Sequence, residues 1–326
     1  MASKINFIFN KSLYLADLDL WLDSRKVKDF GYVSHAHGDH LARHKQILCS
    51  PPTADFLRIR LKNPYYKSLE FGEQFEINSH KISLHPAGHI LGSSQIRIEN
   101  SEGSFLYTGD FRIKQAKTAE QFEFVEADVL IMESTFGLPH YKMPPRPELE
   151  DELLNLCADL LKQGKTPAVF AYSLGKGQEA AKILAEAGLP LAVDYTILRY
   201  IPVYKKHGID FPPIEKLRCS EPEGKVLLLP SGIQKTRRFL KNIENVYTIF
   251  LSGWGMDKSA VYRYGVDKVF PFSDHADFDE LMELVHTIKP QEIYCTHGFD
   301  KFVNILRSQG FHVYPLVKDI QTVLDI

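Results

Sequence analysis

The chain has 326 residues, which is enough for one large domain or two smaller ones. Its composition, 44% hydrophobic and 25% charged, is that of an ordinary soluble globular protein and not of a disordered or membrane protein. The net charge of −2 indicates no general affinity for phosphate backbones, so any contact with nucleic acid has to be local. A disulfide framework and a thiolate zinc site are both disfavoured, because no C-x-x-C pair occurs among Cys49, Cys157, Cys219 and Cys295.

The N-terminal segment lacks the features of a signal peptide or a membrane anchor. Asn10, Lys11 and Asp17 interrupt its apolar stretches. No apolar run in the chain approaches the roughly 18 residues that a membrane-spanning helix needs. We therefore expect a cytoplasmic protein with no membrane contact.

Residues 1–143 are predicted to be rich in β-strands. Polar and apolar residues alternate over 95–99, turn residues follow at 100–103, and an apolar run at 104–107 completes the pattern of a β-hairpin. The first region is expected to end in a rigid linker into a helix that begins near Glu148, because prolines cluster just before it, at Pro139, Pro144, Pro145 and Pro147.

Residues 144–265 are predicted to form a parallel α/β domain. Strand-like runs (TPAVFAYS, LAVD and KVLLLPSG) each precede a helix-like run, over 177–188, 196–208 and 234–244. From residue 266 to 326 the sequence returns to compact strand and turn elements with helices over 278–289 and 301–310. A domain inserted between two separated parts is therefore expected.

The run SHAHGDH, residues 34–40, concentrates metal-binding side chains. His35 and His37 on a tight loop could converge on one ion, and the adjacent Asp39 and His40 could face a second. Gly38 allows the sharp turn between the two pairs. Imidazole and carboxylate ligands without thiolate favour zinc, with manganese as the alternative.

HAHGDH resembles the H-x-H-x-D-H signature of the metallo-β-lactamase fold, an αββα sandwich with two metal ions at the edge of its sheets. The resemblance extends to AGHILGS and YTGDF, which implies that His89 is a ligand of one ion and that Asp110 bridges both. It also implies that Asp23, in WLDSRK, orients the metal loop without binding a metal. The implied fold class is α/β, a metallo-β-lactamase sandwich over 1–143 and 266–326.

The chain as a whole resembles the β-CASP branch of that fold, in which an α/β domain, here 144–265, is inserted. The matching residues are Glu133 in VLIMESTFG, His275 in FSDHADF and His297 in YCTHG. The resemblance implies that Asp39, Glu133 and His275 are catalytic, His275 being a general acid held by Glu133. It also implies two ligand sets. One ion would be bound by His35, His37, His89 and Asp110, and a second by Asp39, His40, Asp110 and His297.

Gly-containing turns after strands of the insert are candidate phosphate contacts, since backbone N–H groups at helix N-termini bind anions. The nucleic-acid-binding candidates are Lys176, Ser231, Gly232 and Ser252. Across the chain, the motifs look most like those of bacterial ligase-associated DNA exonucleases. This implies a zinc-dependent exonuclease in DNA repair that acts on DNA rather than RNA, functionally associated with an ATP-dependent DNA ligase and a helicase.

Three alternatives stay open. An RNA-processing nuclease, of the mRNA 3′-end or RNase J type, would use the same site, and a histidine at position 297 is typical of the RNA enzymes. A catalytically silent nucleic-acid-binding scaffold and a small-molecule hydrolase of lactamase type are the other two. Matched DNA and RNA cleavage would separate these readings.

Overall fold

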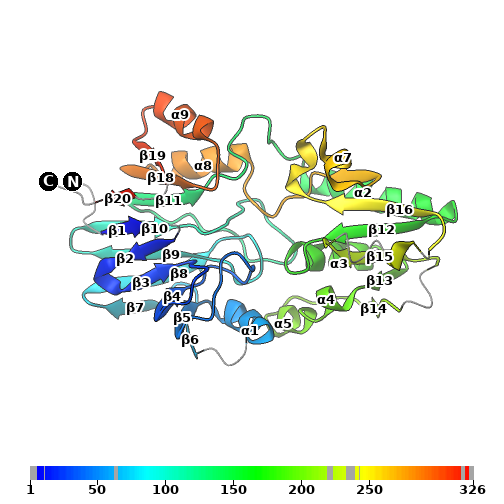
Figure 1. Cartoon of the computed structure of the whole chain (residues 1–326), viewed down its shortest axis with the longest axis horizontal. Coiled ribbons are helices and arrows are strands. Elements are labelled where there is room, and N and C mark those ends of the chain that lie inside the picture. The colour runs from blue at the N-terminus through cyan, green and yellow to red at the C-terminus, as the bar shows by residue number, and fades with distance from the viewer. Residues whose placement is uncertain are drawn as a thin grey trace. The chain divides into compact units, whose positions relative to one another are not determined.

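The computed structural model describes residues 6–10, 12–61, 65–218, 223–232, 239–241, 243–316 and 320–322, the last three by their backbone alone. The chain divides into two compact units. The first unit comprises Met1–Tyr141 and His275–Ile326, and the second unit comprises Lys142–Asp274. Figure 1 labels the elements of both units.

The first sheet of the first unit has seven strands in the order β20-β1-β2-β3-β4-β5-β6. Its pairing is antiparallel from β20 to β3 and parallel from β3 to β6. The helix α1, Pro51–Arg60, begins with two prolines and is capped by Ser50, whose Oγ accepts a hydrogen bond from the Thr53 N–H. The strands are β1 (Phe7–Phe9), β2 (Leu13–Leu15), β3 (Leu20–Leu22), β4 (Phe30–Tyr32), β5 (Gln46–Cys49), β6 (Tyr65–Ser68) and β20 (Ile320–Thr322).

The second sheet of this unit also has seven strands, in the order β19-β18-β11-β10-β9-β8-β7. The predicted hairpin is confirmed: β9 and β10 pair antiparallel, and Asn100 Oδ1 accepts hydrogen bonds from two N–H groups of the turn. The strands are β7 (Gln74–Ile77), β8 (His80–Pro86), β9 (Ser94–Asn100), β10 (Gly103–Tyr107), β11 (Val129–Glu133), β18 (Glu292–Thr296) and β19 (Val313–Pro315).

The two sheets face each other across a shared core. Leu15 and Leu22 from the first sheet belong to the same buried cluster as Ile96 and Phe105 from the second. The opposite face of the second sheet buries Leu130, together with residues of α8 (Phe278–Ile288) and α9 (Asp300–Ser308). In Figure 1, α8 and α9 lie beside β18. The predicted α/β sandwich is thereby confirmed.

The second unit is built on a six-stranded sheet in the order β14-β13-β15-β12-β16-β17. Every described pairing in this sheet is parallel, which confirms the predicted parallel α/β architecture. The elements are α2 (Arg146–Lys162), β12 (Thr166–Ala171), α3 (Lys176–Glu186), β13 (Leu191–Val193), α4 (Tyr195–Leu198), α5 (Ile201–Lys206), β14 (Glu215–Lys216), β15 (Val226–Pro230), β16 (Val246–Leu251), α7 (Ala260–Tyr264) and β17 (Lys268–Phe270).

The prediction of one helix over 196–208 is wrong. The chain forms two short helices there, α4 ending at Leu198 and α5 beginning at Ile201, with Pro202 in the first turn of α5. Proline has no N–H to donate and restricts the residue before it, so it begins a helix more readily than it continues one. The helix expected over 234–244 lies largely outside the described residues.

The end of the second unit also differs from the expected return point at residue 266. Strand β17 pairs with β16, and the second unit extends to Asp274. The partner of a strand is set by long-range pairing, which a local pattern does not contain. Over the described ranges, no helix combines the length and the apolar character needed to cross a membrane.

Candidate metal centre

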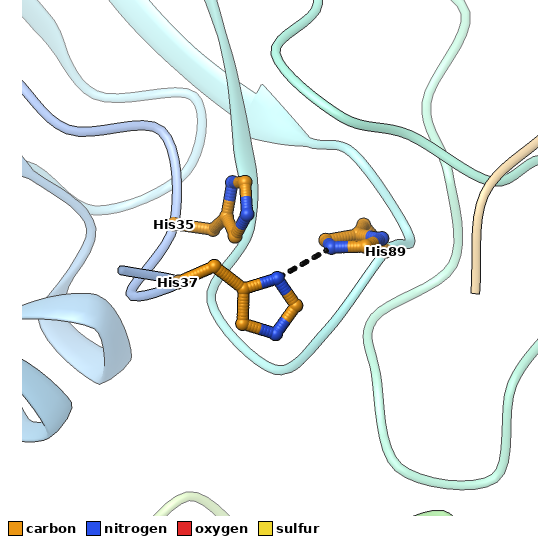
Figure 2. A group of neighbouring side chains, drawn as sticks. All are labelled: His35, His37 and His89. Atoms are coloured by element: carbon orange, nitrogen blue, oxygen red, sulfur yellow. Dashed lines mark hydrogen bonds between the residues drawn. The ribbon is translucent and has the colours of Figure 1, made fainter. Parts of the chain in front are cut away.

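Three buried histidines meet from two loops of the first unit. His35 and His37 follow β4, and His89 follows β8. Their ring centroids lie 4.7–4.9 Å apart, and His89 Nε2 is 3.1 Å from His37 Nδ1. Figure 2 shows the rings of His37 and His89 directed toward each other across the gap between the loops. One nitrogen of each ring lies within 4.8 Å of the others, a spacing that suits a single metal ion.

Two glycines fix the loops that carry His89 and Asp110. Gly88 has φ +72°, and a Cβ there would lie 2.1 Å from the carbonyl oxygen of Arg112. Gly109 has φ +58°, and a Cβ there would lie 2.7 Å from the Ser34 Cβ. Both positions therefore require glycine, because a side chain would be strained and would collide.

Asp110 connects the histidine cluster to a second group. Its Oδ2 lies 3.2 Å from His40 Nε2 and 3.6 Å from His35 Nε2. His35, His40 and Asp110 form a second group with ligand atoms within 4.8 Å of one another. Asp110 is thus near both groups, as a bridging carboxylate has to be.

Asp23 positions the loop that carries the HAHGDH run. It adopts φ 45° directly after β3, in the left-handed region that aspartate tolerates better than most residues. Its carboxylate accepts hydrogen bonds from Ser34 N–H (2.8 Å), Ser34 Oγ (2.6 Å) and Tyr107 OH (2.9 Å), and it contacts His40 Nδ1 at 2.9 Å. Such a contact fixes the orientation of a ligand histidine.

The charges of this cluster depend on burial and on close neighbours. Burial disfavours the charged form of Asp110, but the His40 and His275 rings outweigh it and hold the Asp110 pKa well below its ordinary value. Burial likewise opposes the charge of His40, but Asp110 and Asp23 raise the His40 pKa well above its ordinary value. Burial, and then the charge of His40, lowers the His35 pKa well below its ordinary value. In the metal-free protein His35 is therefore neutral.

The residues present fit a divalent metal ion. His35 Nε2 is buried and has no hydrogen-bond partner among the described residues, although it faces Asp110 and two further imidazoles. A buried polar atom without a partner is costly, and a metal ion would satisfy it. Imidazole nitrogen and carboxylate oxygen are the donors that zinc binds.

His275, which is partly exposed, and the buried Glu133 form a pair next to the cluster. His275 Nδ1 lies 2.9 and 3.0 Å from the two carboxylate oxygens of Glu133. Glu133, at the end of β11, is held by the Phe111 N–H (2.9 Å) and by Thr135 Oγ1 (2.6 Å). The His275 ring centroid is 4.6 Å from that of His89. The structure therefore brings together two residues separated by 142 positions in the chain.

His275 also belongs to a third group of potential ligands, with His89 and Asp110. Its side chain is 25% exposed, whereas the three histidines of the first group are buried. A metal-ligand role and a proton-donor role are thus both chemically open to it.

Asp39 and His297 lie at the edge of this arrangement, outside the three groups found among the described residues. The Asp39 side chain is 50% exposed, with one carboxylate oxygen 3.7 Å from Arg25. The His297 ring centroid is 6.3 Å from that of His40, and its backbone has φ 48°. Both residues line the same cavity as His40.

The nucleic-acid-binding candidates follow parallel strands of the second unit, β12, β15 and β16, which are neighbours in its sheet. Ser231 and Gly232 are partly or fully exposed after β15. Ser252 caps a short turn and accepts a hydrogen bond from the Trp254 N–H at 3.3 Å. Lys176 is 11% exposed and its Nζ is 2.6 Å from an Asp274 oxygen, so its charge is already paired.

The sequence patterns missed two kinds of residue. Ser34 and Tyr107 support Asp23, and their only sequence signal is their position next to the ligand runs. Arg25 and Lys26 line the cavity beside Asp39, and the cluster RKVK after Asp23 was the available signal.

The chain is similar to known proteins over nearly its whole length. Residues 263–308, which include His275 and His297, match the family described as "Zn-dependent metallo-hydrolase RNA specificity domain". A "Probable DNA ligase" from Opitutus terrae is 38% identical over 322 residues, which are 98% of this chain and 32% of that protein. "RNase aCSPSF2" from Saccharolobus solfataricus is 33% identical over 202 residues, 52% of this chain and 40% of that protein.

The chain thus spans 32% and 40% of the length of these two relatives. A crystal structure of a protein of unknown function from Enterococcus faecalis V583 has the same fold, with a TM-score of 0.61 and 14% sequence identity over 90% of this chain and 80% of that one. The matched family, the relatives, the two facing sheets and the histidine and aspartate cluster show that the chain belongs to the β-CASP family of metallo-β-lactamase-fold proteins.

Proposed function

We propose that the chain is a metal-dependent phosphodiesterase that removes nucleotides from DNA ends. The observation that carries the proposal is the His275–Glu133 pair, which lies within the same cluster as the candidate ligands His89 and Asp110. A proton donor beside a metal centre is what cleavage of a phosphodiester requires, because the leaving oxygen has to be protonated.

Two divalent ions, zinc in the first instance, fit this role. One would be held by His35, His37, His89 and Asp110, and the other by Asp39, His40, Asp110 and His297. When bound, such ions would supply the Lewis acidity that activates water and neutralises charge developing on phosphate. The description of the matched family as zinc-dependent supports the choice of metal.

The protein residues would then orient and move protons. Asp23 holds His40 through a 2.9 Å contact and so fixes the ring that faces Asp110. Glu133 stabilises a charged His275 ring, which can donate a proton to the leaving oxygen from its other nitrogen, Nε2. The hydrogen bonds from Phe111 and Thr135 keep Glu133 in place.

DNA is the favoured substrate. The relative named as a DNA ligase matches 98% of this chain, whereas the relative named as an RNase matches 52%. Because the first of these proteins is named as a ligase and is about three times as long as the match, we propose that this chain works alongside a ligase in DNA repair. A helicase partner belongs to the same proposal and rests on the motif resemblance alone.

RNA processing is the second candidate. It is favoured by the description "RNA specificity domain" for residues 263–308 and by the name of the second relative. The same metal centre would serve, so only the substrate differs.

The test is cleavage of single-stranded DNA and RNA of one sequence, labelled at either end. The chain is stripped of metal and then supplied with zinc, manganese or magnesium. We expect DNA to be shortened from one end, with mononucleotides as the first products. The variant Asp110→Ala, purified in the same way, controls for contaminating nucleases. Faster cleavage of RNA would replace the first candidate with the second, and cleavage of neither would refute both.

A further inference from the structure

A cavity of about 930 Å³ opens beside the second metal position of the first unit. At one end it is lined by Asp39, His40 and His297, three of the proposed ligands of the second ion. This volume is near the upper end of the range for small-molecule sites, about 300–1,000 Å³. The cavity is therefore large enough for a ligand that extends well beyond the metal position.

The segment that follows β3 makes one side of the cavity positively charged. Arg25, Lys26 and Lys28 all line it. Ser24 shapes this segment, since its Oγ bonds to the Lys26 carbonyl oxygen at 3.0 Å. The side chain of Arg25 is 70% exposed, and its Nε donates a hydrogen bond to the Asp39 carbonyl oxygen at 2.9 Å. Burial lowers the Lys28 pKa, and the charge of Lys26 lowers it further. A bound anion would offset the repulsion between these two cations.

Besides polar residues such as Asn10, Ser12 and Thr296, the lining has an apolar part. Phe9, Leu13 and Leu316 contribute to it, and Leu13 and Leu316 are buried. The lining thus combines proposed metal ligands, cations and apolar side chains. A nucleotide offers groups that match them, an anionic phosphate and the apolar face of a base.

We propose that this cavity holds one nucleotide of the nucleic acid, on the side of the scissile bond next to the second metal position. Arg25 and Lys26 bind its phosphate through charge-assisted hydrogen bonds, and the base packs against Phe9, Leu13 and Leu316. The proposal rests on the proposed function, since it presupposes a phosphodiester at the metal centre.

The test uses the metal-loaded full chain and the variants Arg25→Gln and Lys26→Gln. Lys45→Gln is the matched control, because Lys45 is also an exposed cation of the first unit but pairs with Asp29 and does not line the cavity. Each variant is measured on a short single strand of the nucleic acid that the chain cleaves faster, and on bis(4-nitrophenyl) phosphate, which is too small to fill the cavity and the metal centre together.

We expect each cavity variant to raise KM for the strand about 10-fold with little change in kcat, because one charge-assisted contact to phosphate is lost. The salt dependence of KM should also become shallower. For Lys26→Gln, hydrolysis of bis(4-nitrophenyl) phosphate and metal content should equal those of the control. Lys26→Gln is the more decisive variant, since Arg25 also contacts Asp39.

Inhibition by thymidine 5′- and 3′-monophosphates shows whether the cavity binds the released nucleotide as well as the strand. If the cavity variants relieve inhibition, the cavity also holds the released product. If inhibition is the same in all variants while the KM shift persists, it holds only the strand. Cavity variants that match Lys45→Gln on the strand would overturn the proposal with the nuclease function intact. Absence of hydrolysis of both substrates by the unmodified chain would instead refute the function.

Discussion

The two halves of the candidate metal centre differ in burial and in spacing. The half made by His35, His37 and His89 is buried, and its ring centroids lie within 4.9 Å of one another. In the other half, Asp39 is 50% exposed and the His297 ring lies 6.3 Å from that of His40. The first half is therefore preformed, whereas Asp39 and His297, the proposed outer ligands of the second half, would have to come closer to His40 to share an ion with it.

This difference has a consequence for metal binding. Ligands held rigidly by the protein bind an ion without an ordering cost, whereas ligands that have to move incur that cost on binding. We expect the first ion to bind more tightly than the second. Asp110 is near both halves, so it is the residue through which the two sites are coupled.

Substitution of that shared residue should have the largest effect. We expect Asp110→Ala to abolish detectable hydrolysis of nucleic acid and to remove the second ion entirely. Loss of a residue that only orients a metal ligand already lowers metal affinity or activity about 10–100-fold, and Asp110 is itself a proposed ligand. Metal content by atomic emission and end-labelled cleavage would measure this. Asp128→Ala is the control, since Asp128 bonds to Ser104 on the same sheet away from the cluster. Two ions retained in Asp110→Ala would contradict a bridging role.

The next test asks whether His275 is a proton donor or a further metal ligand beside His89 and Asp110. We expect His275→Asn to slow cleavage of DNA by about 10²–10⁴-fold, the usual worth of a general acid. The loss should be much smaller on a 4-nitrophenyl ester of thymidine phosphate, whose leaving group needs no proton. His286→Asn, on the exposed face of α8, is the control. Equal losses on both substrates, accompanied by loss of metal, would make His275 a ligand.

The difference between the halves can be increased through Asp23. It contacts His40 but belongs to none of the three ligand groups found among the described residues. Asp23→Asn should therefore weaken the second ion by about 10–100-fold and leave the first nearly unchanged. Stepwise metal titration by calorimetry would separate the two sites, with Asp17→Asn as the control on the exposed surface. Equal weakening of both ions would show that Asp23 organises the whole loop.

The smallest effect is on the metal-free protein. The His40 pKa is raised by Asp110 and Asp23 against burial, so the folded state holds a proton that the unfolded state releases above about pH 6.5. This contribution to the free energy of unfolding is complete below that pH and is lost as the pH rises through the folded-state pKa. Urea unfolding in a chelator should show stability that falls with pH in this window, and His40→Gln should flatten the slope. The same slope in both proteins would rule out His40 as its source.

The His35 pKa is lowered, so it should act in the opposite direction. Its contribution is present above about pH 6.5 and is lost as the pH falls toward the folded-state pKa. The two rings would therefore give slopes of opposite sign on the two sides of about pH 6.5, His35 below it and His40 above it.

Much of the fold could be predicted from local patterns. Alternation over 95–107 predicted the hairpin of β9 and β10, and repeated strand and helix runs predicted the parallel sheet of the second unit. The prediction was wrong where one residue changed the outcome, as Pro202 did between α4 and α5. It was also wrong where pairing decided, as for β17, whose partner β16 assigns it to the second unit.

By itself, the sequence determined which chemical groups the chain carries. The density of histidine and aspartate in SHAHGDH and the glycines that let the ligand loops turn are features of short segments. Only the tertiary structure decided which atoms meet. It brought Glu133 to His275, set Asp23 against His40, and left Asp39 and His297 at the rim of a cavity with a cationic side. The physical reason is that distances between residues far apart in the chain are fixed by how sheets pair and pack, which no short pattern specifies.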